Sequence, residues 1–161
     1  MMLKMGCSEQ ILEVPLFAEL YGYGPFAGRR NQGTRDPLYC RAVSFNEEAN
    51  RSLIVYTDTC TTDDLYAREM RSHIATKFNI LPENIAFVAT HTHSAPKLGR
   101  GTVGVAWGEP LPEFQEYWKE SVVKVAAAAL ANEENIFSVE SGTNTLRCKL
   151  GRNRVDVEKN I

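Results

Sequence analysis

The sequence predicts an α/β protein built on a layered, mixed and partly parallel sheet that is covered by helices. Strand-like runs alternate along the chain with two long amphipathic helical patterns, which is typical of sheets that contain parallel pairs. The 161 residues are 43% hydrophobic and 24% charged. Such a chain has enough apolar surface to bury a core and is too apolar to be disordered. We therefore expect a single domain over residues 1–161.

The first expected element is a short strand within residues 3–14, where Leu3, Met5 and Cys7 alternate with polar or small residues. A segment rich in glycine follows over residues 21–33, and its composition predicts a loop. Its glycine spacing matches no phosphate-binding fingerprint, and no strand leads directly into it. The sequence assigns this loop no function.

Residues 38–45 and 53–56 are expected to form two strands joined by the polar segment 46–50, as in a hairpin. A helix is expected to begin near residues 61–64, because hydroxyls and carboxylates there favour a helix N-terminus. Its expected apolar face has members three to five residues apart. They are Leu65, Ala67, Met70, Ile74 and Phe78.

Residues 85–89 form a short, wholly apolar run, which predicts a strand buried on both faces. A polar loop is expected after it, and a second helix from Pro112 to about residue 131. The expected buried stripe of that helix repeats every three or four residues. It consists of Phe114, Trp118, Val122, Val125 and Ala129. Further strands are predicted at residues 136–141 and 146–150.

Charge and hydropathy exclude several classes of protein. The net charge is −2 and no basic stripe is present, which argues against a nucleic-acid partner. No apolar run approaches the roughly 20 residues that a membrane span requires. The N-terminus lacks the apolar segment of a secretory signal, so the sequence predicts a cytoplasmic protein. The four cysteines at positions 7, 40, 60 and 148 form no CxxC pair, and we expect them to be reduced.

The candidate chemistry centres on His91 and His93, which directly follow the apolar strand 85–89. Ligands of open α/β sheets bind beyond the carboxyl ends of the strands. Two side chains at i and i+2 of an extended segment point the same way, with Cα atoms about 6–7 Å apart. We therefore expect the two imidazoles to converge on one metal ion or one substrate. The alternative is that both are polar residues bonded to neighbouring loops.

A catalytic zinc ion needs about three protein ligands and an open position. Besides the two histidines, only Asp58, Asp36 or Cys60 could complete such a set. Asp58 follows the strand at 53–56 and could ligate the metal, orient a histidine or cap the next helix. His73 falls within the first predicted helix and is expected to be exposed. The predicted metal site is therefore incomplete.

Three blocks of sequence carry a resemblance to a known family. They are NQGTRDPLYCR at residues 31–41, NIAFVATHTHSAP at residues 84–96 and GRNR at residues 151–154. In this order they resemble the N-terminal part of the catalytic domain of the neutral/alkaline non-lysosomal ceramidases and their uncharacterised bacterial relatives. Relatives often carry a histidine where this chain has Arg35, which puts a role for that loop in doubt.

The resemblance implies a zinc-dependent amidase that hydrolyses the N-acyl bond of ceramide-like or other amide substrates. It implies that His91 binds zinc and that His93 is a catalytic residue which positions or polarises the substrate. The remaining ligands and an active-site serine come from later parts of such proteins. We therefore expect this chain to be the N-terminal portion of a longer α/β/α catalytic domain.

Several points stay open at this stage. Arg152 and Asn153 could contact substrate or anchor the chain to the sheet. The expected partner is a small-molecule or lipid-like amide, and a homo-oligomer is also compatible with the sequence. One alternative is a non-catalytic binding or assembly domain that retains the fold. Another is a different HxH metallohydrolase, although barrels of that kind often carry an Asp where this chain has Ala89.

Overall fold

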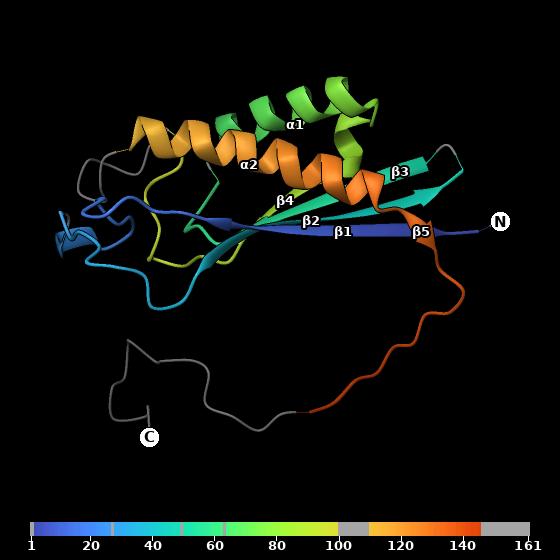
Figure 1. The fold of residues 1–161 in the computed structure, drawn as a ribbon, viewed down its shortest axis with the longest axis horizontal. Helices are drawn as coiled ribbons and strands as arrows, with labels where there is room; N and C mark the ends of the chain where they lie inside the picture. Colours follow the sequence, from blue (N-terminus) through green and yellow to red (C-terminus); the bar gives the residue numbers. More distant parts are fainter. Residues whose placement is uncertain (1, 27, 49, 63, 100–109, 146–161) are drawn as a thin grey trace.

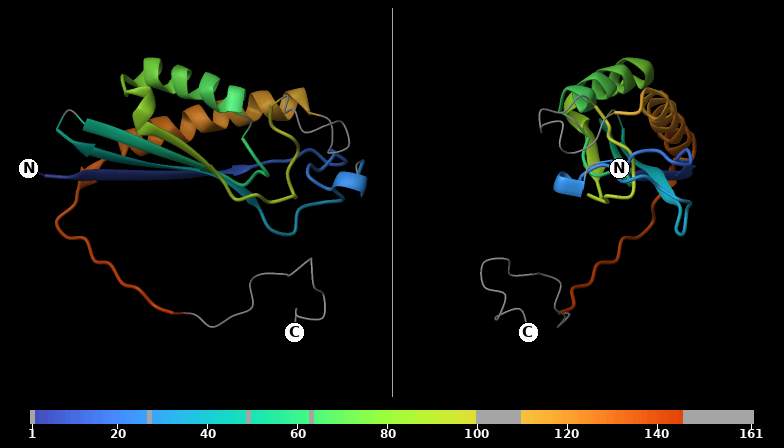
Figure 2. Two further views of the ribbon diagram at one scale, coloured as in Figure 1. Left: turned by 180° about the vertical axis from the view of Figure 1, so that it is seen from behind. Right: turned by 90° about the vertical axis from the view of Figure 1, so that its left-hand side faces the viewer.

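The structure, a computed structural model, describes residues 2–26, 28–48, 50–62, 64–99 and 110–145. Within these ranges it contains a five-stranded sheet with two long helices on one of its faces (Figures 1 and 2). The elements in chain order are β1 (Lys4–Leu12), β2 (Leu38–Glu47), β3 (Asn50–Thr57), α1 (Asp64–Phe78), β4 (Ile85–Ala89), α2 (Pro112–Ala131) and β5 (Glu134–Asn135). Short 3-10 turns occupy Gly24–Phe26 and Pro82–Asn84. The expected α/β fold class is confirmed.

The sheet is mixed, with the strand order β4-β3-β2-β1-β5. β1, β2 and β3 are antiparallel neighbours, and the predicted hairpin over β2 and β3 is confirmed. β3 and β4 are parallel, and α1 makes the crossover that a parallel pair requires. Thr57 lies opposite Ala89 at the ends of the two strands. The segments that follow β3 and β4 therefore leave the sheet at the same edge.

The core lies between the helices and one face of the sheet. The predicted stripe of α2 is buried as expected, and α2 packs on β1 and β2. Trp118 is fully buried, stacks on Tyr66 at 5.6 Å between ring centroids, and donates a hydrogen bond of 2.9 Å from Nε1 to Oγ1 of Thr57. This bond satisfies the polar groups of both buried side chains and links α2 to the end of β3.

The C-terminal half of α2 approaches the sheet closely because small residues face it. A Cβ atom on Gly6 of β1 would overlap the backbone carbonyl of Ala129. Ser44 of β2 is buried, and its hydroxyl donates to the same carbonyl at 3.2 Å. Because Gly6 has no side chain and Ser44 has a small one, the backbone of α2 can approach the sheet closely.

Two expectations about burial are wrong. Leu65 is 74% exposed, whereas Met70 and Ile74 of the same helix are buried. At about 100° per residue, Leu65 is rotated by roughly 140° from Met70 and 180° from Ile74, so it faces away from the sheet. β4 is not buried on both faces either, since Val88 is 43% exposed. This strand is at an edge of the sheet, and the helices cover only one of its faces.

The predicted strand at residues 136–141 is also wrong. β5 consists of Glu134–Asn135 alone, paired with Met5 and Lys4, and one further bond joins the Ile136 amide to the Leu3 carbonyl at 2.8 Å. Because this pairing is antiparallel, the chain beyond Ile136 runs past the start of β1 and loses its partner strand (Figure 1). The predicted strand at residues 146–150 lies outside the described residues.

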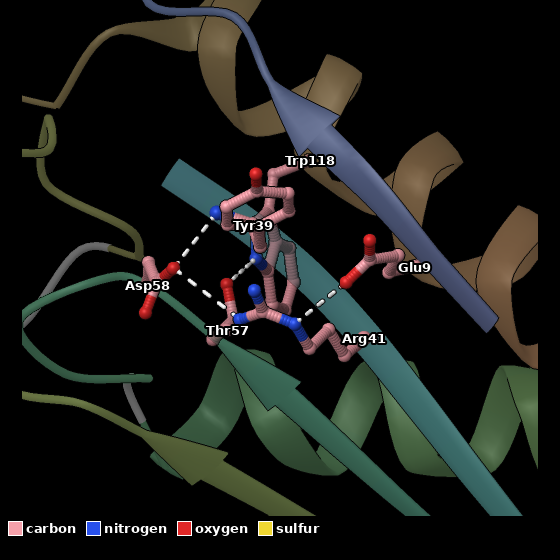
Figure 3. Close-up of polar contacts among 6 residues, drawn as sticks. All are labelled: Glu9, Tyr39, Arg41, Thr57, Asp58 and Trp118. Atoms are coloured by element: carbon pink, nitrogen blue, oxygen red, sulfur yellow. Dashed lines mark hydrogen bonds and ion pairs between the residues drawn. The ribbon is translucent and has the colours of Figure 1, made fainter. Parts of the chain in front are cut away.

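The sheet face opposite the helices carries side chains of mixed character. The Arg41 guanidinium lies 4.0 Å from the centroid of the Tyr39 ring. Its Nε donates to Glu9 at 3.0 Å, and its Nη1 lies 3.7 Å from a carboxylate oxygen of Asp58 (Figure 3).

Among the described helices, none is long and apolar enough to cross a membrane.

Candidate functional site

The candidate site forms where the chain leaves β3 and β4. The two segments stay hydrogen-bonded beyond the strands, from the Thr90 amide to the Thr57 carbonyl at 3.1 Å and from the His91 amide to the Thr59 carbonyl at 3.0 Å. This pairing carries Cys60 alongside His91, although 31 positions separate them in the sequence. The site thus occupies the edge of the sheet where the sequence predicts it.

The backbone at His91 has an unusual conformation. Its φ is +62°, in the left-handed region that side chains other than glycine seldom adopt. The expectation that both histidines lie on an extended segment is therefore wrong at this residue. The rings nevertheless converge, with centroids 5.3 Å apart and planes at 80°. A non-glycine residue held in this region is a common feature of functional sites.

A hydrogen bond fixes the orientation of the His91 ring. Its Nδ1 lies 2.8 Å from the backbone carbonyl of Cys60. Because a carbonyl can only accept, Nδ1 carries the proton and Nε2 presents a lone pair. Metal-binding histidines usually donate their second ring nitrogen to a carbonyl or carboxylate in this way, which fixes the tautomer.

The loop that contains Gly22 holds His93 in place. A Cβ atom at Gly22 would lie 2.6 Å from Nδ1 of His93, and the φ of Gly22 is +96°, so glycine is required there for two reasons. The ring of Tyr23 contacts His93 edge-on, with centroids 5.7 Å apart. The Tyr21 amide donates to the Ala95 carbonyl at 3.0 Å. The glycine-rich loop therefore packs against the second histidine.

Cys60 completes a cluster of possible metal ligands. One ligand atom from each of Cys60, His91 and His93 lies within 4.8 Å of the other two. Cys60 is buried, His93 is partly buried and His91 is exposed, so the cluster opens to solvent on the side of His91. Burial raises the pKa of the Cys60 thiol. The nearby Thr59 and Thr62 hydroxyls are buried without a hydrogen-bond partner among the described residues.

The acidic candidates lie elsewhere. Asp58 accepts a hydrogen bond from the Tyr39 amide at 2.8 Å and pairs with Arg41, so it ties the end of β3 to β2. Asp36 is exposed and bonded to Arg35 at 2.7 Å. Neither aspartate belongs to the cluster around His91. His73 is exposed on α1, as expected.

Two candidates named from the sequence, Arg152 and Asn153, lie outside the described residues.

The wider setting of the site is a cavity of about 930 Å³ beside the histidines. Tyr23, Thr92 and Ser94 are among its lining residues, and the loop between β1 and β2 forms most of its wall. That wall combines apolar and basic side chains. They include Leu12, Val14, Phe17, Leu20, Leu38, Arg29, Arg30 and Arg35.

Sequence reasoning missed two features of the site. It gave no function to the loop over residues 21–33, and it left Cys60 as one of three options. The only sequence signal for Cys60 was its position. It follows β3 closely, as His91 follows β4, and these two strands are parallel.

The fold and the cluster together define an α/β protein with a candidate metal centre at the carboxyl ends of a parallel strand pair. No family model matches the sequence, and no curated protein matches it significantly. The structural comparison does find similar proteins.

The structure is similar to that of the neutral ceramidase from Pseudomonas aeruginosa, with a TM-score of 0.67 and 19% sequence identity over 83% of this chain. It is also similar to a ceramidase complexed with C2, with a TM-score of 0.68 and 19% identity. In each case the chain spans 22% of the length of the solved protein. The resemblance to neutral ceramidases predicted from the sequence is thus confirmed at the level of fold.

Proposed function

We propose that this chain contributes to the catalytic site of a metal-dependent hydrolase that cleaves the N-acyl bond of ceramide-like or other amides. The observation that carries this proposal is the orientation of His91. Its Nδ1 donates to the Cys60 carbonyl, so Nε2 is available as a ligand next to His93. The fold shared with neutral ceramidases supports the same activity.

The residues at the site fit a zinc ion. Neutral imidazole and thiolate are both favoured zinc ligands, and His91 already has the hydrogen bond that orients a ligating ring. When bound, zinc supplies Lewis-acid polarisation of a carbonyl and lowers the pKa of water. In this proposal His91 holds the metal through Nε2.

His93 has a different role in the proposed reaction. Its Nδ1 side packs on Gly22, which leaves Nε2 as the nitrogen that can contact a substrate. A histidine at this distance from a ligand can hydrogen-bond the amide oxygen or transfer a proton to the departing amine. The contacts with Gly22 and Tyr23 limit the rotation of the ring and keep this nitrogen near His91.

The cavity beside the histidines is the proposed site for the substrate. The apolar part of its lining, which includes Leu12, Val14 and Leu38, suits an acyl chain, and the lining residues Thr92 and Ser94 are next to His93 in the sequence. Since the chain spans 22% of the length of the solved ceramidases, we further propose that it acts as one portion of a longer catalytic domain. Other portions would supply the remaining ligands and the serine.

Zinc analysis of the purified chain tests the proposal. We expect about one zinc ion per wild-type chain and a loss of most of it in His91→Ala. His73→Ala is the matched control, because His73 is exposed on α1 and lies outside the cluster. Equal zinc contents in wild type and His91→Ala would contradict the proposal, as would a full-length protein that binds none. In a protein that hydrolyses a short-chain ceramide, His93→Ala should lower kcat by about 100-fold or more.

A further inference from the structure

The described residues place a sulfur atom at the candidate site. Cys60 lies in the segment after β3, and its Sγ is 3.7 Å from Nδ1 of His91. It belongs to the same 4.8 Å cluster as both histidines. We propose that Cys60 is a metal ligand through its thiolate and binds the same ion as the His91 imidazole. This inference rests on the proposed metal site and adds to it a ligand and a preference among metals.

The distances permit this assignment. Ligand bonds of about 2.3 Å to sulfur and 2.0–2.1 Å to nitrogen place tetrahedral S and N ligands about 3.5 Å apart. The cluster atoms lie within 4.8 Å of one another, so modest side-chain movements would bring the ligand atoms to this separation. Cys60 and His91 are also joined through the Cys60 carbonyl, which holds the two residues side by side before a metal binds.

A nucleophilic role for Cys60 fits the same contacts poorly. A catalytic cysteine needs a neighbouring base that accepts its proton. The His91 nitrogen that faces the sulfur already carries a proton, because it donates to the Cys60 carbonyl. A divalent metal is the partner that stabilises a thiolate at such a position.

The ligand types predict which metals bind. One thiolate and one imidazole favour zinc, and cobalt(II) as its spectroscopic substitute, over magnesium, calcium or manganese, which prefer oxygen ligands. His93 remains free for the substrate in this arrangement, and its ring centroid is 5.3 Å from that of His91.

Cobalt(II) titration of the purified chain tests the proposal, because a thiolate ligand gives a near-ultraviolet charge-transfer band that histidine and carboxylate ligands do not give. We expect this band in the wild-type chain and its loss in Cys60→Ser, with at least about a tenfold weaker affinity for cobalt. Cys7→Ser is the matched control, because Cys7 is an exposed free cysteine outside the cluster and its loss should leave the band unchanged.

A second measurement on the wild-type chain does not depend on the folding of a variant. Zinc should slow the alkylation of Cys60 by at least about tenfold, measured by peptide mass analysis, and should leave the rate at Cys7 unchanged. Cobalt binding without the band, or a band that persists in Cys60→Ser, would overturn the role of Cys60 and leave the metal site of His91 intact. A full-length protein that binds no cobalt and no zinc would overturn both. A thiolate band in a full-length protein without amidase activity would support Cys60 as a ligand and contradict only the hydrolase.

Discussion

The two faces of the sheet are stabilised by different interactions, although the same strands form both. Figure 3 shows both faces near β2, with Thr57 and Trp118 on the helix-covered face and Arg41 on the opposite face. On the helix-covered face, Thr57 and Trp118 share a buried hydrogen bond. On the other face, Arg41 contacts an aromatic ring and two carboxylates that are partly exposed to solvent. Successive side chains of a strand point to opposite faces, so one strand contributes both to the dry core and to the solvated surface.

The comparison teaches where the stability of the domain resides. Burial of large apolar side chains contributes more free energy than exposed ion pairs, which contribute about 0–1 kcal/mol each. The covered face should therefore be sensitive to single substitutions and the opposite face tolerant of them.

Trp118→Ala should have the largest effect on folding. It removes a fully buried ring, leaves a cavity beside Tyr66 and deprives the Thr57 hydroxyl of its donor. We expect a loss of about 3–5 kcal/mol in the free energy of unfolding, measured by urea denaturation. Tyr39→Ala removes an aromatic ring from the opposite face and serves as the control. Losses of equal size for the two variants would contradict the comparison.

The buried thiol of Cys40 should make stability depend on pH. Burial, reinforced by the nearby Asp58 carboxylate, raises the pKa of Cys40 to about 12 from a usual value of 9.0. The raised pKa means that the unfolded chain ionises first as the pH rises. The contribution of this thiol is thus fully present below pH 9 and is lost by about 1.4 kcal/mol per unit between pH 9 and 12.

The measurement compares the wild-type chain with Cys40→Ala, because other groups that titrate in this range cancel in the difference. The stability advantage of wild type over the variant should shrink as the pH rises from 9 to 11. Cys7→Ala, at an exposed position on β1, should show no such change. A difference that stays constant over this range would contradict the prediction.

Glu9→Gln should have the smallest effect. The pair between Glu9 and Arg41 is 3.0 Å long but exposed on both sides, so solvent screens it. We expect a loss of less than about 1 kcal/mol, and added salt should reduce this difference further. Thermal unfolding at low and high ionic strength is the measurement. A loss of unfolding free energy as large as that of Trp118→Ala would show that the solvated face contributes as much to stability as the core, and would contradict the prediction.

Local patterns were sufficient to predict much of this fold. The spacing of Trp118 and Val122 indicated which side chains of α2 face the core, and this was confirmed. On β1 the alternation of Leu3, Met5 and Cys7 predicted the strand, but Met5 and Cys7 are exposed and Leu12 faces the core. The errors came from partners that a local pattern does not specify. Residues 136–141 have the composition of a strand, but the register of β5 carries them past the start of β1. Val88 is as apolar as a core residue and is exposed because no helix covers that face.

The candidate site was predictable only in part for a similar reason. The position of His91 and His93 after a strand indicated the end of the sheet at which their rings converge with Cys60. The close approach of Gly22 to His93 joins residues that are far apart in the sequence, and no periodicity signals it. The left-handed backbone at His91 and its bond to the Cys60 carbonyl likewise depend on how β3 and β4 continue beyond their ends.

The left-handed conformation of His91 also bears on how this protein can diverge. Asparagine, aspartate and glycine accept a φ near +60° at low cost, whereas valine, isoleucine and threonine do not. A lineage that loses the imidazole but keeps the fold should therefore carry one of the first three residues at position 91. Related proteins that have lost the activity should therefore be recognisable by asparagine, aspartate or glycine at position 91, while the neighbouring position of Thr92 should vary more freely.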